Sequence, residues 1–245
     1  MLKNKEYIFN GWNDKAVLLF HGATSGSALL RPFANYLNCN GYTVYGVNLA
    51  GHGTTKEDLA KITYRDIIDK AEADYAKIKS DFNKVYVAGI SLGGLTTAYL
   101  ASNHPEIPAF VTFAAGMLLS GDVPKGMGES FDSDYVFRTM ADKKGMYKQY
   151  HVHYEYIPLN FYAKLGQMSA NFVDNRLAEK ITSPALIIHT KDDSMVPYES
   201  SQYLYDNIRS KEKELMLMDE GEHLFVLNEF RYEPFEKALA LFDAH

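Results

Sequence analysis

Short apolar runs alternate along the chain with longer segments in which apolar residues recur at helical spacing. The apolar runs predict strands at 7–9, 16–20, 43–47, 85–88, 109–114, 185–189 and 215–218. The longer segments predict helices at 29–37, 64–78, 94–101, 200–208 and 233–242. Because such an alternation is typical of parallel βαβ units, we expect an α/β fold with a mostly parallel central sheet flanked by helices.

The alternation is interrupted between residues 114 and 185, where about seventy residues join two strands that a crossover of about a dozen could connect. We expect 117–175 to form a cap on the C-terminal edge of the sheet, with 1–116 and 176–245 as the core. Four glycines could let the cap move, namely Gly116, Gly121, Gly126 and Gly128.

The predicted cap is rich in methionine and aromatic residues, which suit an adaptable apolar wall. They are Met117, Met127, Met140, Met146, Met168, Phe131, Tyr135, Phe137, Tyr147, Tyr150, Tyr154, Tyr156, Phe161 and Tyr162. These side chains could line a substrate site, or they could build only the cap's own small core.

Composition adds expectations about where the protein works. The chain has 245 residues, 47% of them apolar, which is enough for one layered core with an insertion. The N-terminus lacks a long apolar stretch, and the single cysteine, Cys39, cannot form an internal disulfide, so we expect a cytoplasmic protein. Cys39 itself is expected to be a small buried hydrophobe. A net charge of -6 without a basic stripe argues against a nucleic-acid partner. We expect no integral membrane association, because the sequence shows no long apolar stretch, and the oligomeric state stays open.

The pentapeptide Gly89-Ile90-Ser91-Leu92-Gly93 joins a predicted strand to a predicted helix. A serine on so sharp a turn needs neighbours without side chains, and Gly89 and Gly93 meet that need. Ser91 could instead be an ordinary helix N-cap, but the flanking glycines favour a nucleophile elbow.

An acid and a histidine follow Ser91 in chain order, each after a later predicted strand. Asp193 lies beyond the strand at 185–189, and His223 lies beyond the strand at 215–218. Loops at the C-terminal ends of parallel strands converge, so the three side chains can meet there as a triad. Asp192 is the alternative acid, and we favour Asp193 because it begins an Asp-x-x-Val-Pro segment.

Three further segments extend the pattern: Phe20-His21-Gly22-Ala23, Asn48-Leu49-Ala50-Gly51-His52-Gly53 and Asp193-Ser194-Met195-Val196-Pro197. With the elbow they resemble an α/β-hydrolase over nearly the whole chain, most closely the bacterial carboxylesterases and monoacylglycerol lipases. The resemblance implies a cap between strands 6 and 7 as that family numbers them. It also implies an oxyanion hole formed by the backbone amides of Ala23 and Leu92, and no cofactor or metal.

The remaining histidines carry weaker expectations. His21 should shape the oxyanion turn, and His52 should organise a neighbouring loop. His151 and His153 are expected to be exposed cap residues rather than metal ligands. His189 ends a predicted strand and could line the pocket.

The expected activity is hydrolysis of small carboxylic esters with short to medium or aromatic acyl groups, through an acyl-enzyme. The same residues leave other serine chemistry open, namely acyl transfer, C–C bond hydrolysis or perhydrolysis. A non-catalytic ligand-binding protein or a protein-interaction module on this scaffold is also an alternative.

Overall fold

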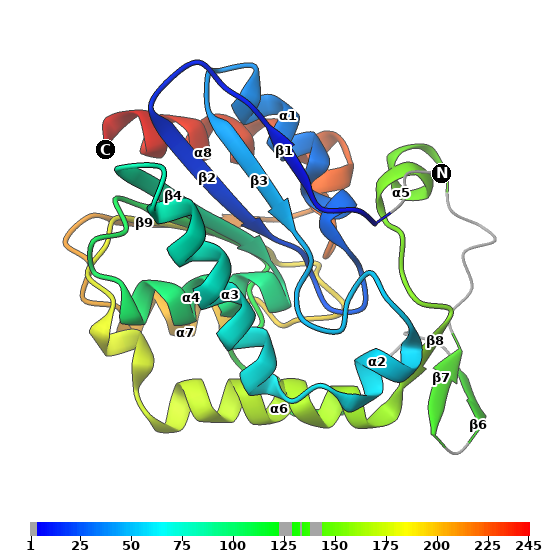
Figure 1. Cartoon of the computed structure of the whole chain (residues 1–245). Helices are drawn as coiled ribbons and strands as arrows, with labels where there is room; N and C mark the ends of the chain where they lie inside the picture. The colour runs from blue at the N-terminus through cyan, green and yellow to red at the C-terminus, as the bar shows by residue number, and fades with distance from the viewer. Residues whose placement is uncertain (1–3, 123–128, 133, 138–143) are drawn as a thin grey trace.

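A seven-stranded sheet forms the centre of the molecule in the computed structural model, which describes residues 4–122, 129–132, 134–137 and 144–245 (Figure 1). Its strands follow the spatial order β1 (Tyr7–Phe9), β3 (Thr43–Val47), β2 (Lys15–Phe20), β4 (Lys84–Ile90), β5 (Phe110–Phe113), β9 (Ala185–Thr190) and β10 (Lys213–Met218). β1 pairs antiparallel with β3, and the other five pairs are parallel. The predicted α/β fold is confirmed.

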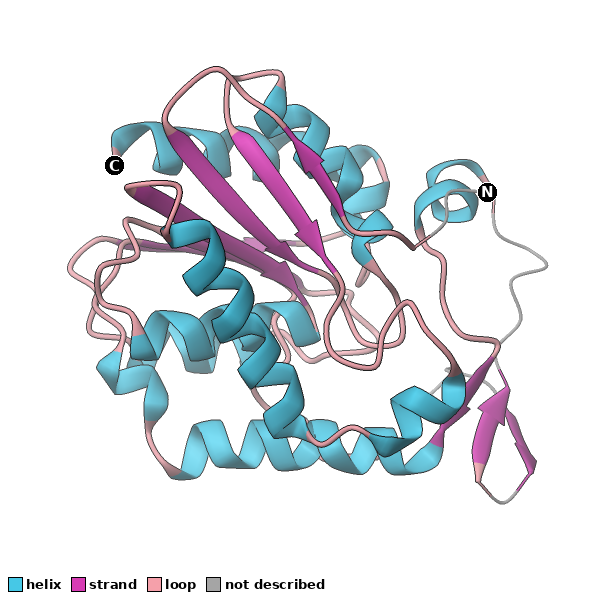
Figure 2. Cartoon of the chain, viewed as in Figure 1, coloured by secondary structure: helices cyan, strands magenta, loops and turns pink. Residues whose placement is uncertain are grey.

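Helices cover both faces of this sheet, as Figure 2 shows. One face carries α1 (Arg31–Asn38) and α8 (Tyr232–Ala244), and the other carries α3 (Tyr64–Lys79), α4 (Leu92–Asn103) and α7 (Glu199–Asn207). Side chains alternate between the two faces along β2: Val17 and Leu19 pack in the core under α1 and α8, and Leu18 and Phe20 in the core under α3, α4 and α7. Because both faces are buried, the strands appear in the sequence as continuous apolar runs.

The insertion lies between β5 and β9, the fifth and sixth strands of this sheet in chain order. It contains a three-stranded sheet of β6 (Glu129–Asp132), β7 (Tyr135–Phe137) and β8 (Tyr156–Pro158), together with α5 (Gly145–Tyr150) and α6 (Leu159–Asp174). Helix α6 runs along the bottom of Figure 1 and buries Phe161, Met168 and Phe172 in the core that also contains α3 and α4. A short 3-10 helix, Leu177–Lys180, leads back to the main sheet.

Helix α2 (Lys56–Lys61) connects the core to the inserted sheet. It begins with a capping box in which the side chains of Thr55 and Asp58 each accept a hydrogen bond from the other's backbone amide. The Nζ atom of Lys56 lies 4.5 Å from the ring centroid of Tyr135 and 4.9 Å from that of Tyr156. This cation–π contact fastens β7 and β8 against the core.

One residue differs from the expectations, and several others cannot be compared with them. Cys39 is exposed rather than buried, because it follows the last turn of α1, beyond the helix's last buried residue. Five expected cap residues cannot be compared with the structure. Met127, Met140, Gly126 and Gly128 lie outside the described residues, and so does the side chain of Phe131.

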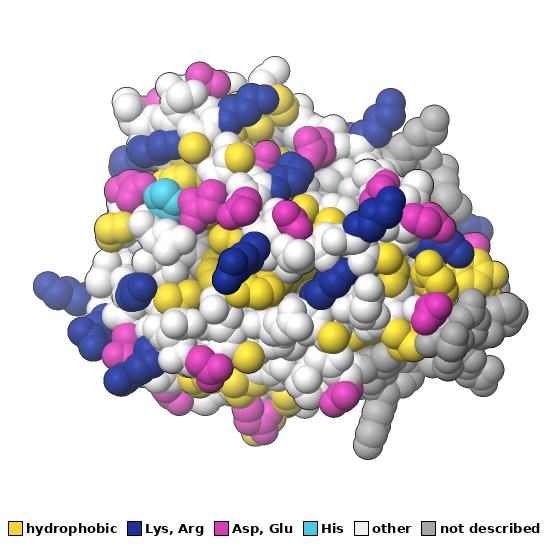
Figure 3. All heavy atoms as spheres, turned by 60° about the horizontal axis from the view of Figure 1, so that its bottom comes forward, with side chains coloured by type: hydrophobic (Ala, Val, Ile, Leu, Met, Phe, Trp, Pro, Cys, Tyr) yellow, Lys and Arg dark blue, Asp and Glu magenta, His cyan; other side chains and the backbone are white. Residues whose placement is uncertain are grey.

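On the face in Figure 3, basic and acidic side chains are interspersed. Within the described ranges, no helix is both long and apolar enough to cross a membrane.

The turn from β4 to α4 brings three pieces of backbone into close contact. A Cβ atom added at Gly89 would lie 2.1 Å from the carbonyl oxygen of Gly93. A Cβ atom added at Gly93 would lie 2.1 Å from the carbonyl oxygen of Phe20 at the end of β2. Glycine at these two positions therefore allows α4 to start directly against the sheet.

Replacing Gly93 with alanine should destabilise the protein, because the backbone atoms it meets cannot move aside as a side chain can. We expect Gly93→Ala to lower the free energy of unfolding by at least about 3 kcal/mol, the upper end of the usual overpacking cost. Gly145→Ala is the matched control, since its added Cβ meets nothing within 4 Å although its φ is 55°. That control should lose only about 1 kcal/mol. Equal losses in urea titrations of the two variants would contradict this account of the turn.

Candidate active site

Ser91 occupies the turn between β4 and α4 in a conformation that side chains rarely adopt. Its φ is 57° and its ψ is −117°, which costs about 1–3 kcal/mol of backbone strain. Its amide donates to the carbonyl of Phe113 at 2.9 Å, and its carbonyl accepts from the amides of Leu95 at 3.1 Å and Gly116 at 3.2 Å. Ser91 stands at the N-cap position of α4, but its side chain makes no capping hydrogen bond, so it is not an ordinary helix N-cap.

Asp193 and His223 form a hydrogen-bonded pair. The Nδ1 atom of His223 lies 2.7 Å from the Oδ2 atom of Asp193, whose side chain is fully buried. The Oδ1 atom of Asp193 accepts hydrogen bonds from the amides of Met195 at 2.8 Å and Val196 at 2.9 Å. Burial alone would raise the pKa of Asp193, but hydrogen bonds from His189, His223 and Val196 outweigh it and hold the pKa well below its usual value.

A second imidazole shares the Asp193 carboxylate. His189 is fully buried, with its Nε2 atom 3.1 Å from Oδ2 of Asp193 and 3.0 Å from the carbonyl oxygen of Val196. Its Nδ1 atom lies 2.7 Å from the hydroxyl of Ser201 on α7. His189 was expected as a pocket residue, but it lies behind the acid because its side chain points into the interface with α7.

Asp192, the alternative acid, has a separate role. Its two carboxylate oxygens accept the amides of Gly221 at 3.0 Å and Glu222 at 2.9 Å. These two residues have φ angles of 142° and 56° and directly precede His223. Asp192 therefore holds the turn that precedes His223. Both of its carboxylate oxygens are bound to backbone amides of that turn rather than to the His223 imidazole.

The direction of the Ala23 amide, the predicted oxyanion donor, is set by hydrogen bonds to the carbonyl of the preceding residue, Gly22. The amide of Ala23 and the carbonyl of Gly22 belong to one planar unit, so fixing the carbonyl fixes the direction of the amide. That carbonyl accepts from Nδ1 of His21 at 2.7 Å and from the amide of Ser25 at 3.3 Å. The Nε2 atom of His21 accepts the amide of Leu49 at 3.0 Å, which assigns the ring proton to Nδ1.

His52 holds the next residue of this turn in the same way. Its Nε2 atom accepts the amide of Thr24 at 3.1 Å, and its Nδ1 atom lies 2.9 Å from the carbonyl of Ala50 as donor. The rings of His52 and His21 lie 4.9 Å apart. Burial lowers the pKa of His52 to about 4 and lowers the pKa of His21 well below its usual value. Both rings therefore stay neutral at neutral pH, as their roles as acceptors require.

Ser91, His223, Ala23 and Leu92 border one cavity of about 390 Å³. Its other walls come from the insertion and from the loop after β9, namely Leu118, Leu119, Ser120, Gly121, Asp122, Tyr162, Leu165, Met195, Val196 and Pro197. The structure thus brings Ser91, His223 and the two residues with the predicted oxyanion amides to one largely apolar cavity, while Asp193 is buried beside His223 and does not line it.

A small second compartment of about 30 Å³ adjoins Ser91 and His223 on another side. It is bordered by Ser25 and His151, among others. His151 is only 4% exposed, so its expected exposure is wrong. The reason is that the segment after α5 turns inward here, against the oxyanion turn, rather than running over the surface.

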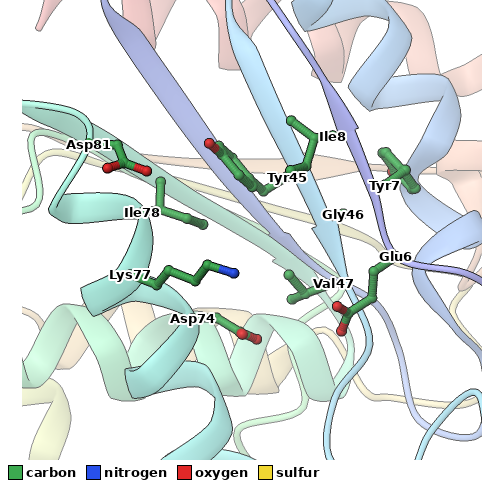
Figure 4. A pocket seen from close by; sticks show the side chains of 10 residues that line it. All are labelled: Glu6, Tyr7, Ile8, Tyr45, Gly46, Val47, Asp74, Lys77, Ile78 and Asp81. Carbon is green, nitrogen blue, oxygen red and sulfur yellow. The ribbon is translucent and has the colours of Figure 1, made fainter.

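A larger cavity, of about 510 Å³, lies between the sheet edge and α3 (Figure 4). Its lining residues are Glu6, Tyr7, Ile8, Tyr45, Gly46, Val47, Asp74, Lys77, Ile78 and Asp81. None of these is a serine, cysteine or histidine, so this cavity lacks the serine and histidine that border the cavity at Ser91. Across the part of the chain that the structure describes, no group of three or more His, Cys, Asp or Glu residues could hold a metal ion.

Known proteins resemble this chain over almost its full length. The chain is 31% identical to the thermostable monoacylglycerol lipase of Bacillus sp. (strain H-257), covering 98% of this chain and 94% of the relative. It is 28% identical to the carboxylesterase of Bacillus subtilis (strain 168), covering 93% and 91%. A solved structure described under the metagenome-derived lipolytic enzymes LipS and LipT superposes with a TM-score of 0.82 at 25% identity, covering 99% and 98%.

The match to a protein-family model is equally extensive. The model named Hydrolase_4 and described as serine aminopeptidase, S33, matches residues 12–230. Together with the fold and these relatives, this match confirms the expected resemblance to α/β-hydrolase esterases. The chain belongs to the Hydrolase_4 (serine aminopeptidase, S33) family and is a serine hydrolase with the α/β-hydrolase fold.

Proposed function

We propose that this protein hydrolyses carboxylic esters of apolar acyl groups, using Ser91, His223 and Asp193 as a catalytic triad. The observation that carries the proposal is the 2.7 Å contact between Asp193 and His223 beside a cavity that Ser91 and His223 share. Because the Asp193 carboxylate accepts the hydrogen bond from Nδ1 of His223, Nε2 of the same ring is left to accept the proton of the Ser91 hydroxyl.

The reaction begins when neutral His223 takes the proton of the Ser91 hydroxyl and the oxygen attacks the ester carbonyl. Asp193 keeps the Nδ1 proton in place and stabilises the imidazolium that forms. His223 then donates its proton to the departing alcohol, which leaves an acyl group on Ser91. Water, deprotonated by His223, releases the acid and restores the enzyme.

The negative charge on the tetrahedral intermediate needs donors that are already in position. The amides of Ala23 and Leu92 serve here, and both residues border the cavity beside Ser91. The Leu92 amide also begins the twelve-residue helix α4, whose positive dipole end favours an anion.

The insertion acts as a cap that selects the acyl group. Leu118, Leu119 and Leu165 present apolar surface to the cavity, opposite Met195 and Val196 of the core. An apolar cavity of this size favours an uncharged aliphatic or aromatic acyl chain over a charged or peptide substrate. The similarity to a monoacylglycerol lipase and a carboxylesterase supports the same class of substrate.

Ser91→Ala tests the nucleophile directly. We expect the wild type to release p-nitrophenol from p-nitrophenyl esters of graded acyl length, with the preferred length reporting the depth of the cavity. The variant should lose at least about 10⁴-fold in kcat while keeping the wild-type circular dichroism spectrum. Undiminished hydrolysis by the variant would refute Ser91 as the nucleophile. A folded wild type inactive on all esters would refute ester hydrolysis.

The two adjacent carboxylates give a matched pair of variants. Asp193→Asn should lower kcat by about 10⁴-fold, because an amide cannot hold the His223 tautomer that attack requires. Asp192→Asn should lower it less than about tenfold, because an amide oxygen can still accept one of the two loop amides. The assignment of the acid is wrong if Asp192→Asn proves the more damaging change.

The buried histidines of the oxyanion turn should make stability depend on pH. The pKa of His52 is about 6.5 when unfolded and about 4 when folded, so the unfolded chain binds a proton first as pH falls. The stability that the neutral ring contributes is complete above about pH 6.5 and is lost as the pH falls toward 4. By pH 5 the free energy of unfolding should have fallen by about 2 kcal/mol. Urea titrations at pH 7 and pH 5 should show this loss, and His52→Gln should show a smaller one. An equal pH slope in both proteins would contradict the role of His52.

A further inference from the structure

We infer that Tyr154, a residue of the insertion, is a positioning residue that sets the oxyanion turn at Ala23. The inference rests on the proposed function, because it concerns the geometry of the proposed oxyanion donor. Tyr154 lies between α5 and β8, in the segment of the insertion that runs beside residues 22–25.

Thr24 is the point at which the insertion meets this turn. It is fully buried with a φ of 61°, a left-handed conformation that a β-branched residue adopts only when its surroundings impose it. Its amide donates to His52 at 3.1 Å, and its carbonyl accepts the amide of Tyr154 at 3.2 Å. Both backbone groups of the strained residue are therefore held, one by the core loop and one by the insertion.

Tyr154 is itself fixed by its hydroxyl group. The hydroxyl donates to the carbonyl of Gly51 at 2.8 Å and accepts the amide of Thr54 at 3.2 Å. Its ring lies edge-on to His52, with 6.4 Å between the ring centroids. One side chain thus joins the loop that carries His52 to the backbone that holds Thr24, so both contacts on Thr24 depend on the same tyrosine.

A second bond joins the same two segments. The hydroxyl of Ser25 donates to the carbonyl of Val152 at 3.3 Å, two residues before Tyr154. The turn is therefore attached to the insertion at two successive residues, Thr24 and Ser25. A shift of 152–154 would be transmitted to the peptide plane of Gly22 and Ala23, whose amide is the proposed donor.

This attachment is separate from the acyl cavity. The insertion residues that line the cavity are Leu118, Leu119, Ser120, Gly121, Asp122, Tyr162 and Leu165, and Tyr154 is not among its lining residues. Loss of the Tyr154 hydroxyl should therefore weaken stabilisation of the tetrahedral intermediate and leave ground-state binding of the acyl chain unchanged.

Tyr154→Phe is the variant that tests the inference, because it keeps the ring and the backbone bond to Thr24. We expect kcat to fall by about tenfold to a hundredfold, somewhat less than the loss of a whole oxyanion donor. KM should stay within about twofold, and the fall should be the same for every acyl length. Tyr156→Phe is the matched control, since it lies two residues away in β8 and packs on Lys56, and it should keep the wild-type kcat.

Inhibitor binding separates positioning from general damage. A trifluoromethyl ketone bound as a tetrahedral adduct should lose affinity for Tyr154→Phe by the same factor as kcat/KM, and a fatty acid product should not. Ser25→Ala, which removes the hydrogen bond to Val152, should likewise lower kcat and leave KM within about twofold, and it provides a second route if Tyr154→Phe folds poorly. Wild-type kcat in Tyr154→Phe, or equal losses of ketone and product affinity, would overturn the inference. A wild type without Ser91-dependent ester hydrolysis would instead overturn the proposed function.

Discussion

The close approach of β4, α4 and β2 is the constraint on which the rest of the site depends. Gly89 and Gly93 leave no space for a Cβ, so the chain reverses within a few residues and Ser91 is forced to a positive φ. That strained conformation lifts the serine above the sheet and exposes the first amides of α4 beside it. The burial of both faces of the sheet supplies the stability that the strain removes.

Around this turn, each proposed reacting group is held by residues that take no part in the chemistry. Backbone amides and His189 orient Asp193, and Asp192 holds the turn that presents His223. Neutral His21 donates to the carbonyl of Gly22, and neutral His52 accepts the amide of Thr24, on either side of Ala23. Buried polar groups of this kind are stable only when every partner is present, so the site behaves as one connected network.

Much of this could be predicted from the sequence, and the failures have physical causes. The core strands were predicted to within two residues because strands buried on both faces are continuous apolar runs. Helix α2 was missed because it has only six residues, although the Thr55 and Asp58 capping box marks its start. The periodic Phe161, Leu165, Met168 and Phe172 could likewise have indicated α6. The roles of His189 and Asp192 could not be predicted, because they depend on contacts between segments whose spacing in the folded chain cannot be read from the sequence.

The position of the proposed acid and base in the sheet has a further consequence. Asp193 and His223 follow β9 and β10, and β10 is an edge strand of the sheet, with none of its residues fully buried. Edge elements with little burial open at a lower free energy than the centre of a core. Ser91 and its glycines, by contrast, lie beside the central strands. Local opening at this edge would therefore separate the proposed base from Ser91 and suspend the proposed activity reversibly, while most of the core remained folded.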